Sequence, residues 1–242
     1  MVYILRYLLI VLYTVFGGTL ALALSVFDRS GEAVIWVARN WVRWILVTCG
    51  VRVDAVGQER LDSTRSYVLM ANHQSVFDTA AIVATLPITF RFVAKRELSW
   101  IPFFGWALVA GGHVIIDRAD RESSVRSLER AAAQVRGGKT VVIFPEGTRS
   151  GRAEIGELKS GGFHLALAAQ VPIVPITVSG SSRITPPRSL RIESGRVHVC
   201  YGEPIPTAGL GIEDRKQLKD RVRRAIEAGF DPDLEPGRHA SA

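Results

Sequence analysis

Cysteine is scarce in this chain of 242 residues, which contains only two. Cys49 and Cys200 lie far apart, and neither has the neighbouring cysteines or histidines that metal-ligand spacing requires. We therefore expect both to be small buried hydrophobic residues in a reducing compartment, rather than a disulfide or a metal site. No metal and no other cofactor is predicted.

The chain also lacks a zinc-finger, RNP or helix-turn-helix pattern. Lysine and arginine together number 30 against 23 aspartates and glutamates, giving a net charge of +7. A basic surface attracts anionic lipid headgroups as well as nucleic acid. Because no nucleic-acid-binding pattern is present, we favour membrane lipids as the anionic partner and expect no nucleic acid.

Charge is absent from the stretch Tyr7–Phe27. An apolar run of about 20 residues is long enough to cross a bilayer as a helix. Arginine is sparser before this run (Arg6) than after it (Arg29 and Arg39), which favours a cytoplasmic location for the C-terminal side of the run. The first interpretation of the run is therefore a single spanning helix.

Two other interpretations compete with a spanning helix. Gly17 and Gly18 interrupt the run, as in half of an interfacial hairpin, and Ala21-Leu22-Ala23 resembles a signal-peptide cleavage site. The next apolar stretch interleaves tryptophan with arginine (Trp36, Arg39, Trp41, Arg43 and Trp44). Indole rings beside arginine are typical of an interfacial helix. We predict a membrane-associating helical pair over residues 1–50, on the cytoplasmic face of the cell membrane, and leave spanning or interfacial topology open.

The rest of the chain shows no internal repeat and is long enough for one substantial core. Short apolar segments predict strands at 67–71, 89–94, 113–116, 140–144, 173–178 and 197–201. Helical patterns fall at 75–85, 123–136, 162–169 and 213–228. This alternation indicates an α/β fold with a mixed, largely parallel central sheet flanked by helices. We predict one domain over residues 51–230 and a flexible tail over residues 231–242.

A histidine and an aspartate five residues apart stand out in the segment Asn72-His73-Gln74-Ser75-Val76-Phe77-Asp78. Neutral imidazole is the usual general base near neutral pH, and a carboxylate can fix its tautomer and stabilise its charged form. Residues five apart on one helix diverge by about 140°. The pair is therefore useful only if His73 lies in a turn and Asp78 lies in the first turn of the next helix, with Ser75 as the N-cap. Taken alone, the pattern fits a structural histidine equally well.

Basic residues near a glycine turn suggest an anion site. Arg149 follows Glu146, Gly147 and Thr148 in the segment Phe144–Ser150. Arginine can grip phosphate oxygens bidentately, and glycine lets the backbone approach a substrate closely. Arg149 is the first candidate for a phosphate contact. Further basic candidates are Lys95, Arg118 and Lys159. Glu146 could bind an acceptor's hydroxyl groups or brace Arg149.

Six blocks of this sequence resemble, in order, the glycerolipid acyltransferase family, most closely the 1-acyl-glycerol-3-phosphate acyltransferases. The first is the His-x4-Asp of His73 and Asp78, and the fourth is the Phe-Pro-Glu-Gly-Thr-Arg-Ser of residues 144–150. The other four are Ala94–Leu98 with Trp100–Trp106, Gly111–Arg118, Lys159–Phe163 and Val171–Ile176. A single block would be weak evidence, but six in order are strong.

The resemblance implies an enzyme that needs no nucleophile of its own. His73 would take a proton from a hydroxyl of lysophosphatidate while that oxygen attacks an acyl thioester, and Asp78 would orient the imidazole. Lys95 and Arg149 would contact the acceptor's phosphate. The product would be phosphatidic acid, and the donor either acyl-CoA or acyl-carrier protein. Ser75 lacks the G-x-S-x-G context of a nucleophilic serine, so we interpret it as a cap.

Other functions remain possible at this point. The acceptor could be glycerol-3-phosphate, another lysophospholipid or a glycolipid, and a non-catalytic membrane adaptor could share the fold. A metal-dependent hydrolase is disfavoured because no third ligand accompanies His73 and Asp78. The segment 91–112 could line an acyl-chain channel or form core helix. Arginines over 121–136 suggest a solvated helix face first, and contact with the donor second.

Overall fold

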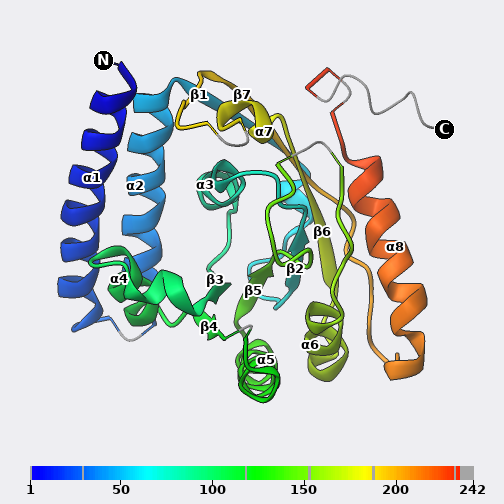
Figure 1. The fold of residues 1–242 in the computed structure, drawn as a ribbon. Helices are drawn as coiled ribbons and strands as arrows, with labels where there is room; N and C mark the ends of the chain where they lie inside the picture. The colour runs from blue at the N-terminus through cyan, green and yellow to red at the C-terminus, as the bar shows by residue number, and fades with distance from the viewer. Residues whose placement is uncertain are drawn as a thin grey trace.

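The structure is a computed structural model that describes residues 2–28, 30–117, 119–151, 154–186, 189–231 and 233–234. Two helices begin the chain and lie side by side along one flank of the molecule (Figure 1). They are α1, Val2–Ser25, and α2, Glu32–Cys49. The predicted pair of N-terminal helices is confirmed. Most of the tail predicted over 231–242 lies outside the described residues.

A seven-stranded sheet forms the centre of the molecule. Its strands are β1 Val51–Val56, β2 Val68–Ala71, β3 Phe90–Lys95, β4 Val114–Ile116, β5 Thr140–Ile143, β6 Ile173–Ser179 and β7 Gly195–Tyr201. They lie in the order β1-β7-β6-β2-β5-β3-β4, and the only antiparallel pair in this order is β6 with β7. The predicted mixed, largely parallel sheet is confirmed. The sequence analysis missed β1, an edge strand in which only alternate residues are shielded.

Helices connect the strands and cover both faces of the sheet (Figure 1). They are α3 Val76–Thr85, α4 Phe104–Ala110, α5 Arg121–Arg136, α6 Gly161–Ala169, α7 Ser181–Ile184 and α8 Arg215–Ala228. Three 3-10 turns add η1 Gln58–Arg60, η2 Arg96–Trp100 and η3 Ile212–Asp214. The four predicted helices begin within two residues of the observed ones. The short helices α4 and α7 were not predicted.

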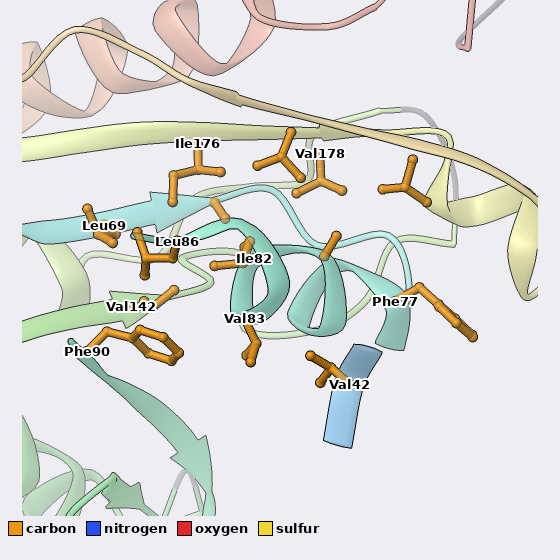
Figure 2. Close-up of a cluster of buried hydrophobic side chains, with 14 of the residues drawn as sticks. Val42, Leu69, Phe77, Ile82, Val83, Leu86, Phe90, Val142, Ile176 and Val178 are labelled. Carbon is orange, nitrogen blue, oxygen red and sulfur yellow. The ribbon is translucent and has the colours of Figure 1, made fainter. Parts of the chain in front are cut away.

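Alternate residues of each strand feed two separate cores, because successive side chains of a strand point to opposite faces. In β2, Leu69 and Ala71 pack with α2 and α3, whereas Val68 and Met70 pack with α5, α6 and α8. Figure 2 shows the first of these cores, where Ile82 and Val83 of α3 lie among strand residues. Cys49 is buried in the same core as predicted, whereas Cys200 is only partly buried. Both cysteines are free, and desolvation raises the pKa of each thiol.

Strand register brings distant segments to one edge of the sheet. β2 pairs in parallel with β5, with Met70 opposite Ile143, and also with β6, with Ala71 opposite Ile176. Because parallel strands end on the same side, the segments after them leave the sheet close together. Ligands of open α/β sheets bind beyond this edge. The two predicted motifs come after β2 and β5 and therefore meet there.

Candidate active site

The turn after β2 is fixed by a buried asparagine. Asn72 donates from Nδ2 to the carbonyl of Val178 at 2.9 Å, and its Oδ1 accepts the Val178 N–H at 2.7 Å. With this pair of hydrogen bonds, the Asn72 side chain pairs with β6 as the backbone of a neighbouring strand residue would. His73 is consequently held just past the sheet edge.

Asp78 accepts hydrogen bonds from backbone N–H groups of the same turn. Ser75 caps α3 by accepting the N–H of Phe77, and Asp78 Oδ2 accepts the N–H groups of Gln74 and Ser75 at 2.6 and 2.8 Å. The same oxygen lies 2.8 Å from Nδ1 of His73. A carboxylate beside Nδ1 places the ring proton there and leaves Nε2 able to accept another. The predicted arrangement, with His73 in a turn and Asp78 in the first helical turn, is confirmed.

Aromatic packing limits movement of the imidazole. The rings of His73 and Phe144 stack with centroids 4.0 Å apart and planes 18° apart, and Phe144 stacks in turn on Phe92. The side chain of His73 is 17% exposed, whereas Asp78 has no exposed surface. The imidazole therefore reaches the surface while the carboxylate beside it is shielded from water.

Glu146 holds the turn that contains His73. Its Oε1 accepts the backbone N–H of His73 at 2.6 Å, and its Oε2 accepts the N–H of Gly156 at 2.8 Å. Burial raises the pKa of this carboxyl, while these two hydrogen bonds oppose the rise. Both oxygens are thus engaged by backbone. This explains how an acidic residue can sit beside a proposed anion site.

The turn containing Gly147 is hydrogen-bonded to the turn that contains His73. Gly147 has φ +74°, a left-handed conformation, and a Cβ there would lie 3.0 Å from Lys159 Nζ, so the lysine side chain passes over the glycine. Ser150 donates its N–H to the carbonyl of His73 at 2.8 Å. Thr148 and Arg149 are exposed on the outer side of this turn. The predicted residues 147–149 and 159 therefore belong to, or lie against, the turn that is hydrogen-bonded to His73.

Two other candidate residues are placed less closely. Lys95 ends β3, beside β5, and its ammonium group pairs with Glu97 at 2.8 Å. It stands at the same sheet edge but does not line the cavity described next. Arg118 lies outside the described residues. On α5, Arg126 is exposed and paired with Glu122, which agrees with a solvated face.

A largely apolar cavity of about 470 Å³ opens beside the imidazole. Helices α1, α2, α3 and α4 supply most of its wall. From the segment 91–112, the cavity is lined by Phe92, Leu98, Phe104, Ala107 and Leu108. The polar side chains of His73, Arg149 and Thr185 also line it. A cavity of this kind suits a hydrocarbon chain with a polar end, which the imidazole and the guanidinium would face.

Sequence reasoning missed two hydroxyl groups at this site. Ser181 Oγ donates to Asp78 Oδ1, and Thr185 Oγ1 lies 2.6 Å from Ser75 Oγ. Both residues belong to the segment after β6, far along the chain from the motifs, and no spacing rule points to them. Among the described residues, no three His, Cys, Asp or Glu side chains gather so as to hold a metal ion.

Comparison with known proteins agrees with this geometry. The acyltransferase family model matches residues 52–179, more than half of the chain. The 1-acyl-sn-glycerol-3-phosphate acyltransferase of Saccharomyces cerevisiae is 31% identical over 95% of this chain and 80% of its own. The alpha enzyme of that name from Bos taurus is 36% identical over 75% of this chain; the match spans 63% of the bovine protein.

A solved structure shares the whole fold. The crystal structure of the 1-acyl-sn-glycerophosphate (LPA) acyltransferase PlsC from Thermotoga maritima superposes with a TM-score of 0.80, covering 94% of each chain at 27% identity. The predicted resemblance is therefore confirmed. The match of the family model, the relatives and the shared architecture together show that this chain belongs to the acyltransferase family.

Proposed function

We propose that this protein transfers an acyl chain from a thioester to the free hydroxyl of 1-acyl-glycerol-3-phosphate, giving phosphatidic acid. The observation that carries the proposal is the hydrogen-bonded pair of His73 and Asp78 beside a cavity that is apolar along its length and lined by Arg149. The names of the relatives support lysophosphatidate as the acceptor.

In the proposed reaction, His73 acts first as a general base and then as a general acid. Nε2 of His73 accepts the proton of the acceptor hydroxyl while the oxygen attacks the thioester carbonyl, forming the new C–O bond. Asp78 stabilises the resulting imidazolium through Nδ1. The tetrahedral oxyanion then collapses, the C–S bond breaks, and the imidazolium returns its proton to the departing thiolate. No enzyme nucleophile and no cofactor takes part.

The tetrahedral oxyanion needs hydrogen-bond donors, and the backbone N–H groups near the two motifs are the first candidates. The N–H groups of Gln74 and Ser75 already donate to Asp78, and that of Gly147 donates to the carbonyl of Phe144 at 3.0 Å. Two of these groups directly follow His73 in the chain, and the third lies in the turn whose Ser150 N–H donates to the carbonyl of His73. Because all three N–H groups already have acceptors, the oxyanion donor in this proposal is a different group.

We assign the phosphate of the acceptor to Arg149, with Lys159 and Lys95 as further contacts and the backbone at Gly147 and Thr148 beside it. Arg149 shares the cavity wall with His73, which suits a glycerol backbone that carries a hydroxyl at one carbon and a phosphate at another. Guanidinium is the better bidentate partner for phosphate oxygens. The acyl donor is acyl-CoA or acyl-carrier protein.

Membrane association forms part of the proposal. α1 is 24 residues long and apolar enough to cross a membrane by length and composition. One of its faces, however, contacts the domain at two separate points: Tyr3 donates to Glu193, and Gly18 packs directly on Phe103. Spanning would draw these domain segments into hydrocarbon. We therefore favour an interfacial α1 on the cytoplasmic face, lying in one leaflet.

The test uses purified protein in mixed micelles. Labelled acyl-CoA is supplied as the donor, and lysophosphatidate and glycerol-3-phosphate are supplied together as competing acceptors. Mass spectrometry should find phosphatidic acid as the main product, and none with His73→Ala. Exclusive acylation of glycerol-3-phosphate would replace the acceptor in the proposal. Undiminished turnover by His73→Ala would refute the base.

A further inference from the structure

The two oxygens of the Asp78 carboxylate have unequal surroundings. Oδ2 faces Nδ1 of His73 and the N–H groups of Gln74 and Ser75. Oδ1 accepts the hydroxyl of Ser181, which comes from the other side of the carboxylate. Asp78 and Ser181 are both wholly buried, at 0% exposure. A charged oxygen shielded from water depends on protein donors, because losing one costs the full desolvation of that atom.

We propose that Ser181 is a positioning residue for acyl transfer, acting through Asp78; this rests on the roles of His73 and Asp78 proposed above. Its hydroxyl holds Oδ1, so that the carboxylate cannot rotate and Oδ2 stays directed at the imidazole. Without the hydroxyl, the carboxylate turns to share the N–H donors of the turn between its two oxygens. The imidazole then loses its orientation toward the cavity.

Local structure delivers this hydroxyl with little freedom. β6 ends at Ser179, and Gly180 turns the chain with φ +83°, where a Cβ would lie 2.6 Å from the carbonyl oxygen of Arg196. Helix α7 follows at once, and Ile184 anchors it in the core at 1% exposure. The turn and the anchor fix Ser181 relative to the sheet edge.

Two neighbouring contacts bear on the assignment. Ser181 Oγ also lies 3.3 Å from Gln74 Oε1, but the carboxylate is the closer and charged acceptor, so the proton goes to Asp78. Thr185, one residue beyond α7, touches the cap residue Ser75 at 2.6 Å. The segment 181–185 therefore holds the catalytic turn at two points. The family match ends at residue 179, before both of them.

The experiment compares Ser181→Ala with Ser182→Ala, its neighbour on the same short helix. Rates are measured with acyl-CoA and lysophosphatidate in mixed micelles. We expect Ser181→Ala to lower kcat about tenfold, because small misplacements of a catalytic group cost one to two orders of magnitude. KM for both substrates should stay within about twofold, since no binding group is touched. Ser182→Ala should match the wild type.

A double-mutant cycle separates positioning from general damage. In an Asp78→Asn background, the residual rate should fall less than about twofold on adding Ser181→Ala, because the two residues act as one unit. An equal loss in both backgrounds would overturn the proposal. Ser181→Thr, which keeps the hydroxyl, should recover most of kcat.

Further outcomes keep the two proposals distinct. If Ser181→Ala does not fold, Ser181→Cys fills the same space with a weak donor, and wild-type kcat in that variant would overturn the assignment. If Asp78→Asn alone leaves kcat unchanged, the catalytic pair itself fails. If Asp78→Asn is slow while Ser181→Ala is not, only the positioning role fails.

Discussion

Arg149, on the turn after β5, and Lys159, which reaches that turn from the segment before α6, carry like charges but differ in what they can do for a phosphate. Lys159 lies over Gly147, whereas Arg149 lines the cavity beside His73. A planar fork grips two phosphate oxygens at once, and an ammonium group acts as a point charge. At the scale of single residues, Arg149 is therefore the side chain on which acceptor affinity should depend most.

Arg149→Ala should raise KM for lysophosphatidate by about 10- to 100-fold, since a hydrogen-bonded charge is worth about 1.5–3 kcal/mol. KM for acyl-CoA should change little. Steady-state kinetics with each substrate varied in turn provide the measurement. Arg221→Ala, an exposed arginine on α8, is the control and should bind both substrates normally. An equal rise in both KM values for Arg149→Ala would contradict phosphate recognition by this residue.

A second histidine should make the fold sensitive to acid. Nδ1 of His113 accepts the N–H of Phe92 at 2.8 Å. Desolvation of the ring, helped by the nearby charge of Arg91, lowers the pKa of His113 from 6.5 to about 3. The unfolded chain therefore binds the proton more readily than the folded one between these two values. Stability is lost as the pH falls below 6.5.

Between pH 7 and pH 5 the wild type should lose about 2 kcal/mol of unfolding free energy through His113, at 1.36 kcal/mol per unit of pKa difference. His113→Asn keeps an acceptor for the Phe92 N–H but cannot be protonated. Its stability should therefore vary less with pH, although it is lower at pH 7. Denaturant unfolding in detergent at pH 7, 6 and 5 tests this. Parallel losses in both proteins would exclude His113 as the cause.

At the scale of elements, the packing of α1 depends on one of two adjacent glycines. A Cβ at Gly18 would lie 2.6 Å from Phe103 Cβ and 2.9 Å from its carbonyl carbon and oxygen. A Cβ at Gly17 would meet the Trp41 side chain at 3.5 Å, an ordinary contact. Gly18 therefore allows α1 to approach the segment before α4, and Gly17 does not serve that purpose.

Gly18→Ala should destabilise the protein by about 1–3 kcal/mol, the usual cost of overpacking. Gly17→Ala should be neutral, or should stabilise by up to about 1 kcal/mol, because alanine favours helix. Thermal unfolding of the two variants in the same detergent gives a direct comparison. The reverse ranking would show that α1 does not rest on Phe103.

The elements that carry strong hydrophobic patterns could be predicted from the sequence. The apolar strands and four helices of the domain were predicted. Turn and cap residues allowed a contact of His73 with Asp78, and the family resemblance implied it. The short helix α7 has no periodicity to detect, because four residues make a single turn. The contacts of Ser181 and Glu146 depend on sheet order, which brings segments after β5 and β6 next to the turn after β2. Local sequence patterns do not indicate which strands are neighbours in the sheet, so these contacts could not be predicted.

At the scale of the whole molecule, α2 and α1 contribute unequally to the core. Ile35, Val42 and Leu46 of α2 are buried in the core over the sheet, so removing residues 1–50 would also open that core. α1 instead exposes a row of large apolar side chains. They are Ile4, Leu5, Leu8, Val11, Leu12 and Phe16, each more than half exposed. Charges placed on this row therefore test membrane binding without removing core residues.

Leu8→Lys together with Leu12→Lys should release the protein from liposomes, because each leucine at 63% and 60% exposure is available to lipid. Ile212→Lys is the matched control, since Ile212 is also exposed, at 54%, but lies in η3 beside α8. Flotation of both variants with uncharged phosphatidylcholine vesicles provides the measurement, because anionic lipid would attract the added lysines. Continued flotation of the α1 variant would contradict anchoring by this face.

α1 has its exposed row on one side, while Ile10, Thr14 and Gly17 on its other side line the cavity. Under the proposed function, only one helix, α1, then separates the hydrocarbon of the bilayer from the bound acyl chain. A substrate drawn from the leaflet has only to pass around one helix to be enclosed, without exposing its tail to water. Substitutions on the two sides of this helix should consequently alter separate properties: residence on the lipid surface on the outside, and tolerated chain length on the inside.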